Sequence, residues 1–208
     1  IDVGAGGSSP ANLTNVDGTL FFAASDGANG VELWKSDGTS AVRVKDVCPG
    51  ATGSSPANLT NVNSTLFFTG NDGMNGVELW RSDGTSSGTV LVKDICAGAN
   101  GSSPANLTSV NGTLFFAADD GIDGTELWQS NGTESDTLSV AAVYGGVSVS
   151  SPANLTDVNG TLFFTGSNST YGAELWKIDP FIGNVLVKDI YGGTAGSSPA
   201  NLTNVNGT

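Results

Sequence analysis

The sequence predicts an all-β protein, a β-propeller built from four-stranded antiparallel blades of about 47 residues. Two recurring phrases carry this prediction. The proline of Ser-Ser-Pro-Ala-Asn-Leu-Thr recurs at spacings of 46, 48, 48 and 47, at Pro10, Pro56, Pro104, Pro152 and Pro199. The tryptophan of Glu-Leu-Trp keeps the same period, at Trp34, Trp80, Trp128 and Trp176. One repeat therefore accounts for the whole chain.

The prolines divide the array into four full repeats with a partial repeat at each end. Residues 1–9 end a preceding repeat, residues 10–55, 56–103, 104–151 and 152–198 are the full repeats, and residues 199–208 begin a further one. We predict that Ile1-Asp2-Val3 ends a fourth strand and that Leu202–Val205 is a first strand. Because such partial repeats have unpaired edges, the expected partners are further repeats of the same or a neighbouring chain.

Each repeat is predicted to contain four short strands. In the second repeat these are Leu59–Val62, Thr65–Thr69, Val77–Arg81 and Thr89–Ile95. Asp-Gly and Asn-Gly pairs between the first and second strands, and again between the third and fourth, supply the positive φ values of two-residue hairpins. The fourth repeat has Asp179-Pro180 at the later position, so its chain must turn differently there. A longer loop with glycine joins the second and third strands.

A single sheet of this kind would expose apolar side chains on both faces, as Phe21 and Phe22 illustrate. Burial of a large apolar side chain stabilises by roughly 1.5–3 kcal/mol, so we expect the repeats to stack on one another. A propeller meets this need. A β-solenoid is the alternative, but its coils require open corners where this sequence has two-residue hairpins.

The sequence Glu32-Leu33-Trp34-Lys35-Ser36-Asp37-Gly38-Thr39 resembles the ELWxxDGT repeat of bacterial and algal surface proteins. The second copy, residues 78–85, matches equally well, whereas the third has Asn131 for the aspartate and the fourth ends Ile178-Asp179-Pro180. The resemblance implies an extracellular or cell-surface location and a scaffolding role. It does not imply an activity.

Charge and composition exclude several kinds of function. Seven lysines and arginines against 20 aspartates and glutamates give a net charge of −13, which disfavours nucleic acid and anionic lipid as partners. No apolar run reaches the roughly 20 residues that span a bilayer. Because histidine is absent, the usual catalytic triads and general base are missing, and we predict that the chain is not an enzyme.

The glutamate of Glu-Leu-Trp occurs once per repeat, at Glu32, Glu78, Glu126 and Glu174. Catalytic carboxylate pairs seldom arise at one repeated position. We therefore expect structural roles for these glutamates. They would pair with Lys35 or Lys45, or accept backbone hydrogen bonds at a blade edge.

Calcium is the one candidate cofactor. The loop between the second and third strands combines hard oxygen donors at Asp26, Asn29 and Glu32, and the pattern recurs at Asp72, Asn75 and Glu78 and at Asp120, Asp123 and Glu126. The fourth repeat has no aspartate in this loop and should bind worst. Asp-Gly and Asn-Gly are also ordinary turn formers, which is the simpler interpretation.

Two further residue types invite modification. Asn-x-Ser/Thr sequons abound, and Asn131 and Asn168 are the better glycosylation candidates because they lie in predicted loops. Cys48 and Cys96 occupy the same repeat position. Equivalent points on adjacent blades should lie too far apart for a disulfide, so each cysteine either pairs elsewhere or remains a small buried apolar residue.

Two functional hypotheses follow. The first is a non-enzymatic structural or adhesive scaffold of a cell surface, sheath or appendage. The alternative is a lectin-like propeller with one shallow carbohydrate site per blade, in which repetition supplies avidity.

Overall fold

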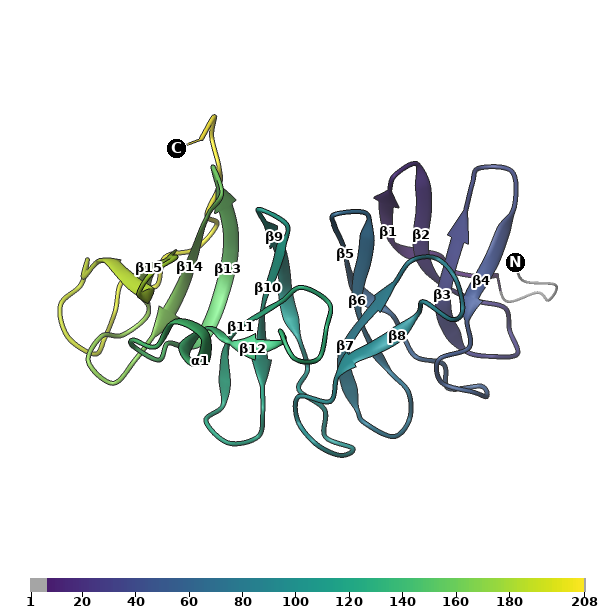
Figure 1. Cartoon of the computed structure of the whole chain (residues 1–208), viewed down its shortest axis with the longest axis horizontal. Helices are drawn as coiled ribbons and strands as arrows, with labels where there is room; N and C mark the ends of the chain where they lie inside the picture. The colour runs from purple at the N-terminus through teal and green to yellow at the C-terminus, as the bar shows by residue number, and fades with distance from the viewer. Residues whose placement is uncertain (1–6, 208) are drawn as a thin grey trace. The chain divides into compact units, whose positions relative to one another are not determined.

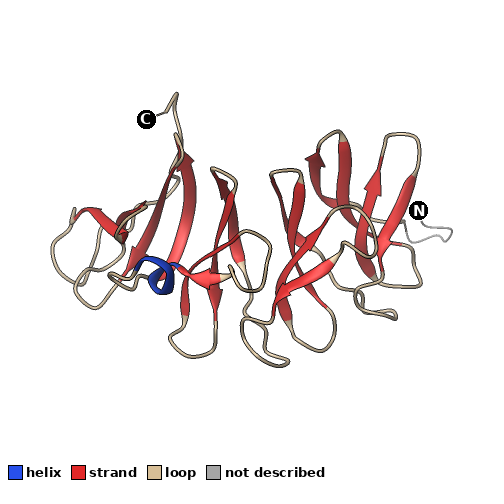
Figure 2. Cartoon of the chain, viewed as in Figure 1, coloured by secondary structure: helices blue, strands red, loops and turns tan. Residues whose placement is uncertain are grey.

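The computed structural model describes residues 7–207, which form antiparallel β-strands joined by turns and loops (Figures 1 and 2). The chain divides into two compact units, Ile1–Pro104 and Ala105–Thr208, each with its own hydrophobic core. The predicted strand at Ile1-Asp2-Val3 lies outside the described residues. Within residues 7–207, no helix is both long enough and apolar enough to cross a membrane.

The first unit confirms the predicted four-stranded meander in both of its repeats. One sheet has the order β1-β2-β3-β4 and the other β5-β6-β7-β8, and all neighbouring strands are antiparallel. The strands are β1 (Ala11–Val16), β2 (Thr19–Ser25), β3 (Val31–Ser36), β4 (Ala41–Lys45), β5 (Ala57–Val62), β6 (Thr65–Asn71), β7 (Val77–Ser82) and β8 (Val90–Lys93).

The second unit departs from the prediction of separate sheets. Its two repeats form one eight-stranded sheet, because Ser150 at the start of β13 pairs with Glu126 of β11. The elements are β9 (Ala105–Val110), β10 (Thr113–Asp119), β11 (Thr125–Ser130), β12 (Leu138–Ser139), α1 (Val140–Tyr144), β13 (Ser150–Val158), β14 (Thr161–Ser167), β15 (Glu174–Asp179) and β16 (Gly183–Lys188). The all-β prediction is thus confirmed, whereas four independent blades are not found.

The irregularity in the third repeat has a local cause. Ala141 and Ala142 stand where the second repeat has Lys93 and Asp94, and alanine is the best helix former. The Ser139 side chain accepts a hydrogen bond from Ala142 N at 3.2 Å, which caps the five-residue helix α1. The fourth strand of this repeat therefore ends after two residues.

The hairpins follow the turn chemistry of the sequence in one position and not in the other. Asp17 and Gly18 both have positive φ, 47° and 84°, as a two-residue turn requires, and the other repeats do the same at this position. The later Asp-Gly pairs do not form such turns. Asp37 Oδ1 instead accepts hydrogen bonds from Thr39 N and Ser40 N in a longer loop, so the predicted two-residue turn is wrong there.

The fourth repeat turns differently, as predicted. Asp179 pairs with Gly183 across three intervening residues, and Asp179 Oδ1 accepts a hydrogen bond from Phe181 N at 2.9 Å. Residues 202–205 have no strand assignment, so the predicted strand Leu202–Val205 is not found.

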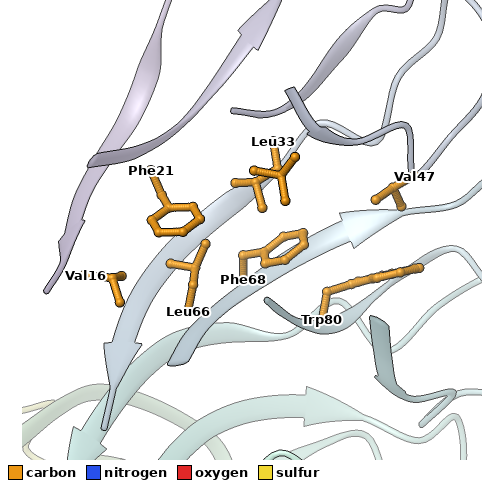
Figure 3. Close-up of a cluster of buried hydrophobic side chains, with 8 residues drawn as sticks. Val16, Phe21, Leu33, Val47, Leu66, Phe68 and Trp80 are labelled. Carbon is orange, nitrogen blue, oxygen red and sulfur yellow. The ribbon is translucent and has the colours of Figure 1, made fainter. Parts of the chain in front are cut away.

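Neighbouring repeats pack through two different faces of their sheets. In the first repeat, alternate residues form what we term the Val-Phe-Leu face, and in the second repeat the facing residues form the Leu-Phe-Trp face (Figure 3). The first face comprises Val16, Phe21, Leu33, Val44 and Val47, and the second Leu66, Phe68 and Trp80. The third and fourth repeats pack in the same way. All four repeat tryptophans are between 2% and 8% exposed, so each lies in a packed core.

Candidate functional site

The glutamate of each Glu-Leu-Trp phrase lies at the best-defined polar site of the repeat. In the first repeat, Glu32 of β3 is completely buried. Its carboxylate accepts hydrogen bonds from Val47 N at 3.2 Å, Cys48 N at 3.1 Å, Ser54 N at 3.0 Å and Ser54 Oγ at 2.5 Å. Glu32 thereby fastens the segment that follows the fourth strand, just before the next repeat begins. We call this arrangement the glutamate latch.

The latch recurs in the second and fourth repeats. Glu78 accepts hydrogen bonds from Cys96 N at 3.2 Å, Ser102 N at 2.7 Å and Ser102 Oγ at 2.5 Å. Glu174 accepts them from Ile190 N, Tyr191 N, Ser197 N and Ser197 Oγ. Of the two predicted roles for these glutamates, the structure contains the second, acceptance of backbone hydrogen bonds.

The third repeat lacks the full latch. Glu126 is half-buried and accepts a hydrogen bond from Ser148 Oγ, two residues before the equivalent serine of the repeated phrase. Val149 precedes that phrase where the other repeats have glycine. The third repeat therefore shows the same glutamate without the full set of hydrogen bonds, and it serves as an internal control for the other three repeats.

The electrostatics of the latch differ among the repeats. Burial raises the pKa of Glu32 and Glu78, against the lowering effect of the hydrogen bonds that they accept. Burial also acts to raise the pKa of Glu174, but its hydrogen bonds from Ser197, Ile190 and Tyr191 together outweigh burial, and this pKa is lowered. The Glu174 latch therefore contributes stability above the ordinary glutamate pKa and loses it as pH falls through the lowered value.

The predicted calcium loops are turn-forming networks in the structure. Asp26 accepts hydrogen bonds from Ala28 N and Asn29 N, and its second oxygen accepts one from Asn29 Nδ2 at 2.8 Å. Asp72 and Asn75 repeat this pattern. In the third repeat, Asp120 Oδ1 accepts hydrogen bonds from Ile122 N and Asp123 N.

These loops do not share partners with the latch glutamates. Because Glu32, Glu78 and Glu126 bond to other segments, each predicted trio divides between two separate hydrogen-bond networks. Within residues 7–207, no group of three or more His, Cys, Asp and Glu side chains is arranged to hold a metal ion. In the fourth repeat Asn168 Oδ1 bonds Thr170 N and Tyr171 N, so an amide replaces the aspartate and the turn is kept.

The Asp26 carboxyl should titrate at an unusually low pH. The Asn29 amide, then the Asn29 side chain and the Ala28 amide, lower its pKa from 3.8 to about 2. The hydrogen bonds of this loop are therefore expected to hold above pH 3.8 and to weaken as pH falls through about 2. Carboxyl-carbon NMR measures the titration directly, and a midpoint at or above 3.8 would contradict the observed geometry.

A close backbone contact accompanies each complete latch. Val31 and Gly53 form a parallel bridge, and Ser55 N donates a hydrogen bond to Val31 O at 2.9 Å. A Cβ atom on Gly53 would collide with the backbone of Val31. The equivalent glycines of the second and fourth repeats are Gly101 and Gly196. A Cβ atom on them would collide with the backbone of Val77 and of Ala173, respectively.

Replacing Gly101 with alanine is expected to destabilise the chain by about 2–3 kcal/mol, since a Cβ would meet Val77 N and the residue has a φ of 66°. Gly124→Ala is the matched control, because Gly124 also has positive φ but no heavy atom lies within 4 Å of its added Cβ. The control should cost about 1 kcal/mol. Urea denaturation measures both, and equal losses would contradict the contact.

The candidate modification sites are partly engaged. Asn131 is exposed, but its Nδ2 donates a hydrogen bond to Asp136 at 2.7 Å. Asn168 is half-buried in the turn that its own Oδ1 caps. Cys48 is buried and Cys96 is half-buried. Burial raises the pKa of the Cys48 thiol, which reduces its reactivity.

Sequence reasoning missed the serines of the latch. Ser54, Ser102 and Ser197 each supply both an N–H and an Oγ–H to a buried glutamate. The sequence does contain a signal for them, since each opens a Ser-Ser-Pro phrase that follows the glutamate by 22 to 24 residues. The Ser-Ser-Pro phrase was used only to define the repeat length. Its hydrogen bonds to the glutamate of Glu-Leu-Trp were not predicted.

Pockets recur at one place within each unit, beside the turns between the first and second strands of successive repeats. In the first unit a pocket of about 190 Å³ is lined by Asp17, Lys35, Ser64 and Asp83, among others. In the second unit the equivalent pocket is about 280 Å³ and includes Asn111, Gly160 and Tyr144. Tyr144 belongs to α1, so the third repeat gives its pocket an aromatic wall.

Comparison with known proteins finds similar solved structures but no similar sequences. No model of a known protein family matches the sequence, and no curated protein matches it. A mutant puromycin hydrolase complexed with PGG matches 93% of this chain at 16% identity, with a TM-score of 0.54. A puromycin-hydrolyzing peptidase of Mycobacterium tuberculosis matches 93% at 12% identity, with a TM-score of 0.55.

The matches concern only part of these proteins. The chain spans 29% and 33% of the length of the two hydrolases. An α-L-arabinofuranosidase of Clostridium thermocellum also matches, covering 96% of this chain and 76% of that one at 16% identity, but its TM-score of 0.35 carries no argument. Likeness at these identities shows the fold alone.

The prediction that the chain is not an enzyme is contradicted by these comparisons. Similar folds occur within hydrolases, so the fold is compatible with membership of an enzyme. The absence of histidine from 208 residues excludes only those catalytic groups that these residues would themselves supply. The absence of histidine here gives no information about catalytic residues outside these 208 residues.

Proposed function

We propose that the chain is a run of β-propeller blades of the ELWxxDGT type, serving as a structural or adhesive scaffold at a cell surface, sheath or appendage. The observation that carries the proposal is the glutamate latch, which fastens the connection leading to the next repeat. A buried carboxylate that accepts three or four hydrogen bonds makes such a connection rigid. Rigid connections suit an array that must keep its form outside the cell.

The cellular location is tested with an antibody raised against residues 7–207 and applied to intact and permeabilised cells of the source organism. A surface scaffold should be labelled on intact cells, and brief protease treatment of those cells should remove the signal. Labelling that requires permeabilisation would contradict the proposal. A cytoplasmic protein of known abundance serves as the control for cell integrity.

A carbohydrate-binding role is the second candidate, and the recurring pockets favour it. They lie at equivalent places in the two units and combine amide or hydroxyl groups with apolar walls, as sugar sites do. Tyr144 offers an aromatic surface in one of them. A glycan array decides between the candidates, because a lectin should bind a defined glycan class that Tyr144→Ala weakens, whereas a scaffold should bind none.

A further inference from the structure

The pocket of about 280 Å³ between the third and fourth repeats lies wholly within the second unit. Phe115 and Leu162 of its lining belong to the buried core, and Tyr144 of α1 forms an aromatic wall. Pockets for drug-sized ligands usually measure about 300–1,000 Å³. The occupant is therefore a small molecule or a single residue of a longer polymer.

Close packing holds Tyr144 in place. The helix α1 follows β12 and ends at Tyr144 (Figure 1). A Cβ atom on Gly183 would come within 3.0 Å of both Tyr144 Cβ and Gly145 O, so only glycine allows this approach to the fourth repeat. Asn184 Nδ2 donates a hydrogen bond to Val147 O at 2.9 Å, which fixes the segment after the helix. The aromatic wall is thus ordered before any ligand arrives.

The departure of the third repeat from the glutamate latch supplies this tyrosine. Tyr144 follows Glu126 by 18 residues, as Cys96 follows Glu78. The N–H of Cys96 donates to Glu78 in the latch of the second repeat. In the third repeat Glu126 bonds the side chain of Ser148 instead, and Tyr144 ends α1. The residue that the latch would fasten therefore lines the pocket.

Polar groups on the other wall are available to a ligand. Asn111 Nδ2 donates to Gly160 O at 2.8 Å, which orients the amide and leaves its Oδ1 and its second N–H to face a ligand. Among the described residues, the hydroxyl groups of Thr113, Thr161 and Tyr144 have no hydrogen-bond partner. The pocket thus offers both donors and acceptors beside an aromatic ring.

The pocket is also uncharged. None of the described residues that line it has a charged side chain, whereas the pocket at the equivalent place in the first unit has Asp17, Lys35 and Asp83. The net charge of −13 further disfavours an anionic ligand. A pyranose ring meets these conditions, because its hydroxyl groups donate and accept hydrogen bonds and its C–H groups are attracted to the negative face of an aromatic ring.

We propose that this pocket binds one neutral pyranose residue. The C–H face of the sugar lies against Tyr144, and its hydroxyl groups bond Asn111 and Thr161. The site is specialised in the third repeat and is not repeated in every blade. The inference rests on the carbohydrate-binding candidate function, which it narrows to one site and one class of sugar. A free sugar and the end of a polysaccharide share this chemistry.

Titration followed by ¹H–¹⁵N NMR tests the proposal on the 208-residue chain. The neutral probes are methyl glucoside, methyl galactoside, methyl mannoside and N-acetylglucosamine, and glucuronate is the charged control. At least one neutral sugar should bind with a Kd on the order of 1 mM and shift the amide signals of Tyr144, Gly160 and Thr161. Glucuronate should bind at least about 10-fold more weakly.

A trisaccharide of the sugar that binds identifies the source. A site for the end of a polysaccharide should bind the trisaccharide at least as tightly as the single sugar. A site for a free sugar should bind the single sugar more tightly.

Variants test the two walls of the pocket separately. Tyr144→Ala should weaken binding at least about 10-fold, because the stacking ring is lost. Tyr191→Ala is the matched control, since Tyr191 is a tyrosine that is 60% exposed and does not line the pocket, and it should leave binding unchanged. Thr161→Val keeps the shape of the side chain and removes its hydroxyl, which should weaken binding about 3- to 10-fold. Retained dispersion of the NMR signals shows that each variant folds.

Two kinds of failure can be told apart. A sugar that shifts Ser64 and Gly84 of the first pocket alone, or whose binding survives both Tyr144→Ala and Thr161→Val, would overturn this inference and leave carbohydrate binding standing. Glucuronate binding as tight as that of the neutral sugars would also overturn it. No shift with any sugar at about 20 mM would overturn both the inference and the carbohydrate-binding candidate. The scaffold role is tested independently by labelling of intact cells.

Discussion

Replacing Glu78 with alanine is expected to lower the free energy of unfolding by about 3–5 kcal/mol. The substitution leaves Cys96 N, Ser102 N and Ser102 Oγ without the carboxylate that accepts their hydrogen bonds, in a site where the glutamate is completely buried. Buried donors without partners cost more than the net worth of the bonds they made. Urea denaturation followed by far-UV circular dichroism measures the loss.

Glu126→Ala is the matched control in the same chain. Glu126 has the same place in its repeat but is half-buried and bonds Ser148 Oγ, so its removal should cost about 0.5–1.5 kcal/mol. Glu78→Gln should fall between the two alanine variants, because an amide keeps the size but turns one acceptor into a donor. Equal effects of Glu78→Ala and Glu126→Ala would show that the latch does not stabilise the repeat.

Replacing Trp176 with alanine should also cost about 3–5 kcal/mol. This ring is 2% exposed, packs in the core of the second unit, and donates from Nε1 to Gly166 O at 2.9 Å. The substitution therefore creates a cavity and leaves a carbonyl without its donor.

Phe181→Ala is the control for the tryptophan, because Phe181 is a large aromatic residue that is 87% exposed. It should change stability by less than about 0.5 kcal/mol. The same urea measurement applies to both variants. A loss below about 1 kcal/mol for Trp176→Ala would place that ring outside any packed core.

The regular part of the fold could be predicted from the sequence because its signals are local. Alternation in Leu20-Phe21-Phe22 defines a strand with two apolar faces, and Asp17-Gly18 supplies the turn before it. Both depend on residues adjacent in the chain. The stacking of repeats followed from the same alternation, since apolar side chains on both faces need cover on both sides.

The irregular part of the fold could not be predicted from the repeat period, because local preferences in single repeats override the repeated pattern. Ala141 and Ala142 favour a helix over the expected strand, and Ser150 pairs with Glu126 to fuse two sheets. The later Asp-Gly pairs failed as hairpins because Asp37 caps a longer loop through its own side chain. The helix cap at Ser139 and the Asp37 loop involve side-chain bonding to the backbone, and the Ser150–Glu126 pair joins strands of different repeats; a pattern of apolar residues registers neither.

The glutamates of the site were predicted from the sequence, but the serines that bond to them were not. Glu32 was identified, and acceptance of backbone hydrogen bonds was one of its two expected roles. Its partner Ser54 lies 22 residues away, so that no local rule could join them. Grouping Glu32 with Asp26 and Asn29 rested on closeness in sequence, and the structure divides them between two networks.

Amide hydrogen exchange of Ser54, Ser102 and Ser197 tests the glutamate latch most directly. These amides lie outside the strands, yet each donates to a latch glutamate at 2.7 to 3.0 Å. They should therefore exchange at least about 10³-fold more slowly than unprotected amides, as slowly as those of the neighbouring strands. In the Glu78→Ala variant, protection of Ser102 should be lost first. Exchange of the three amides at the rate of an open loop in the wild-type chain would contradict the latch.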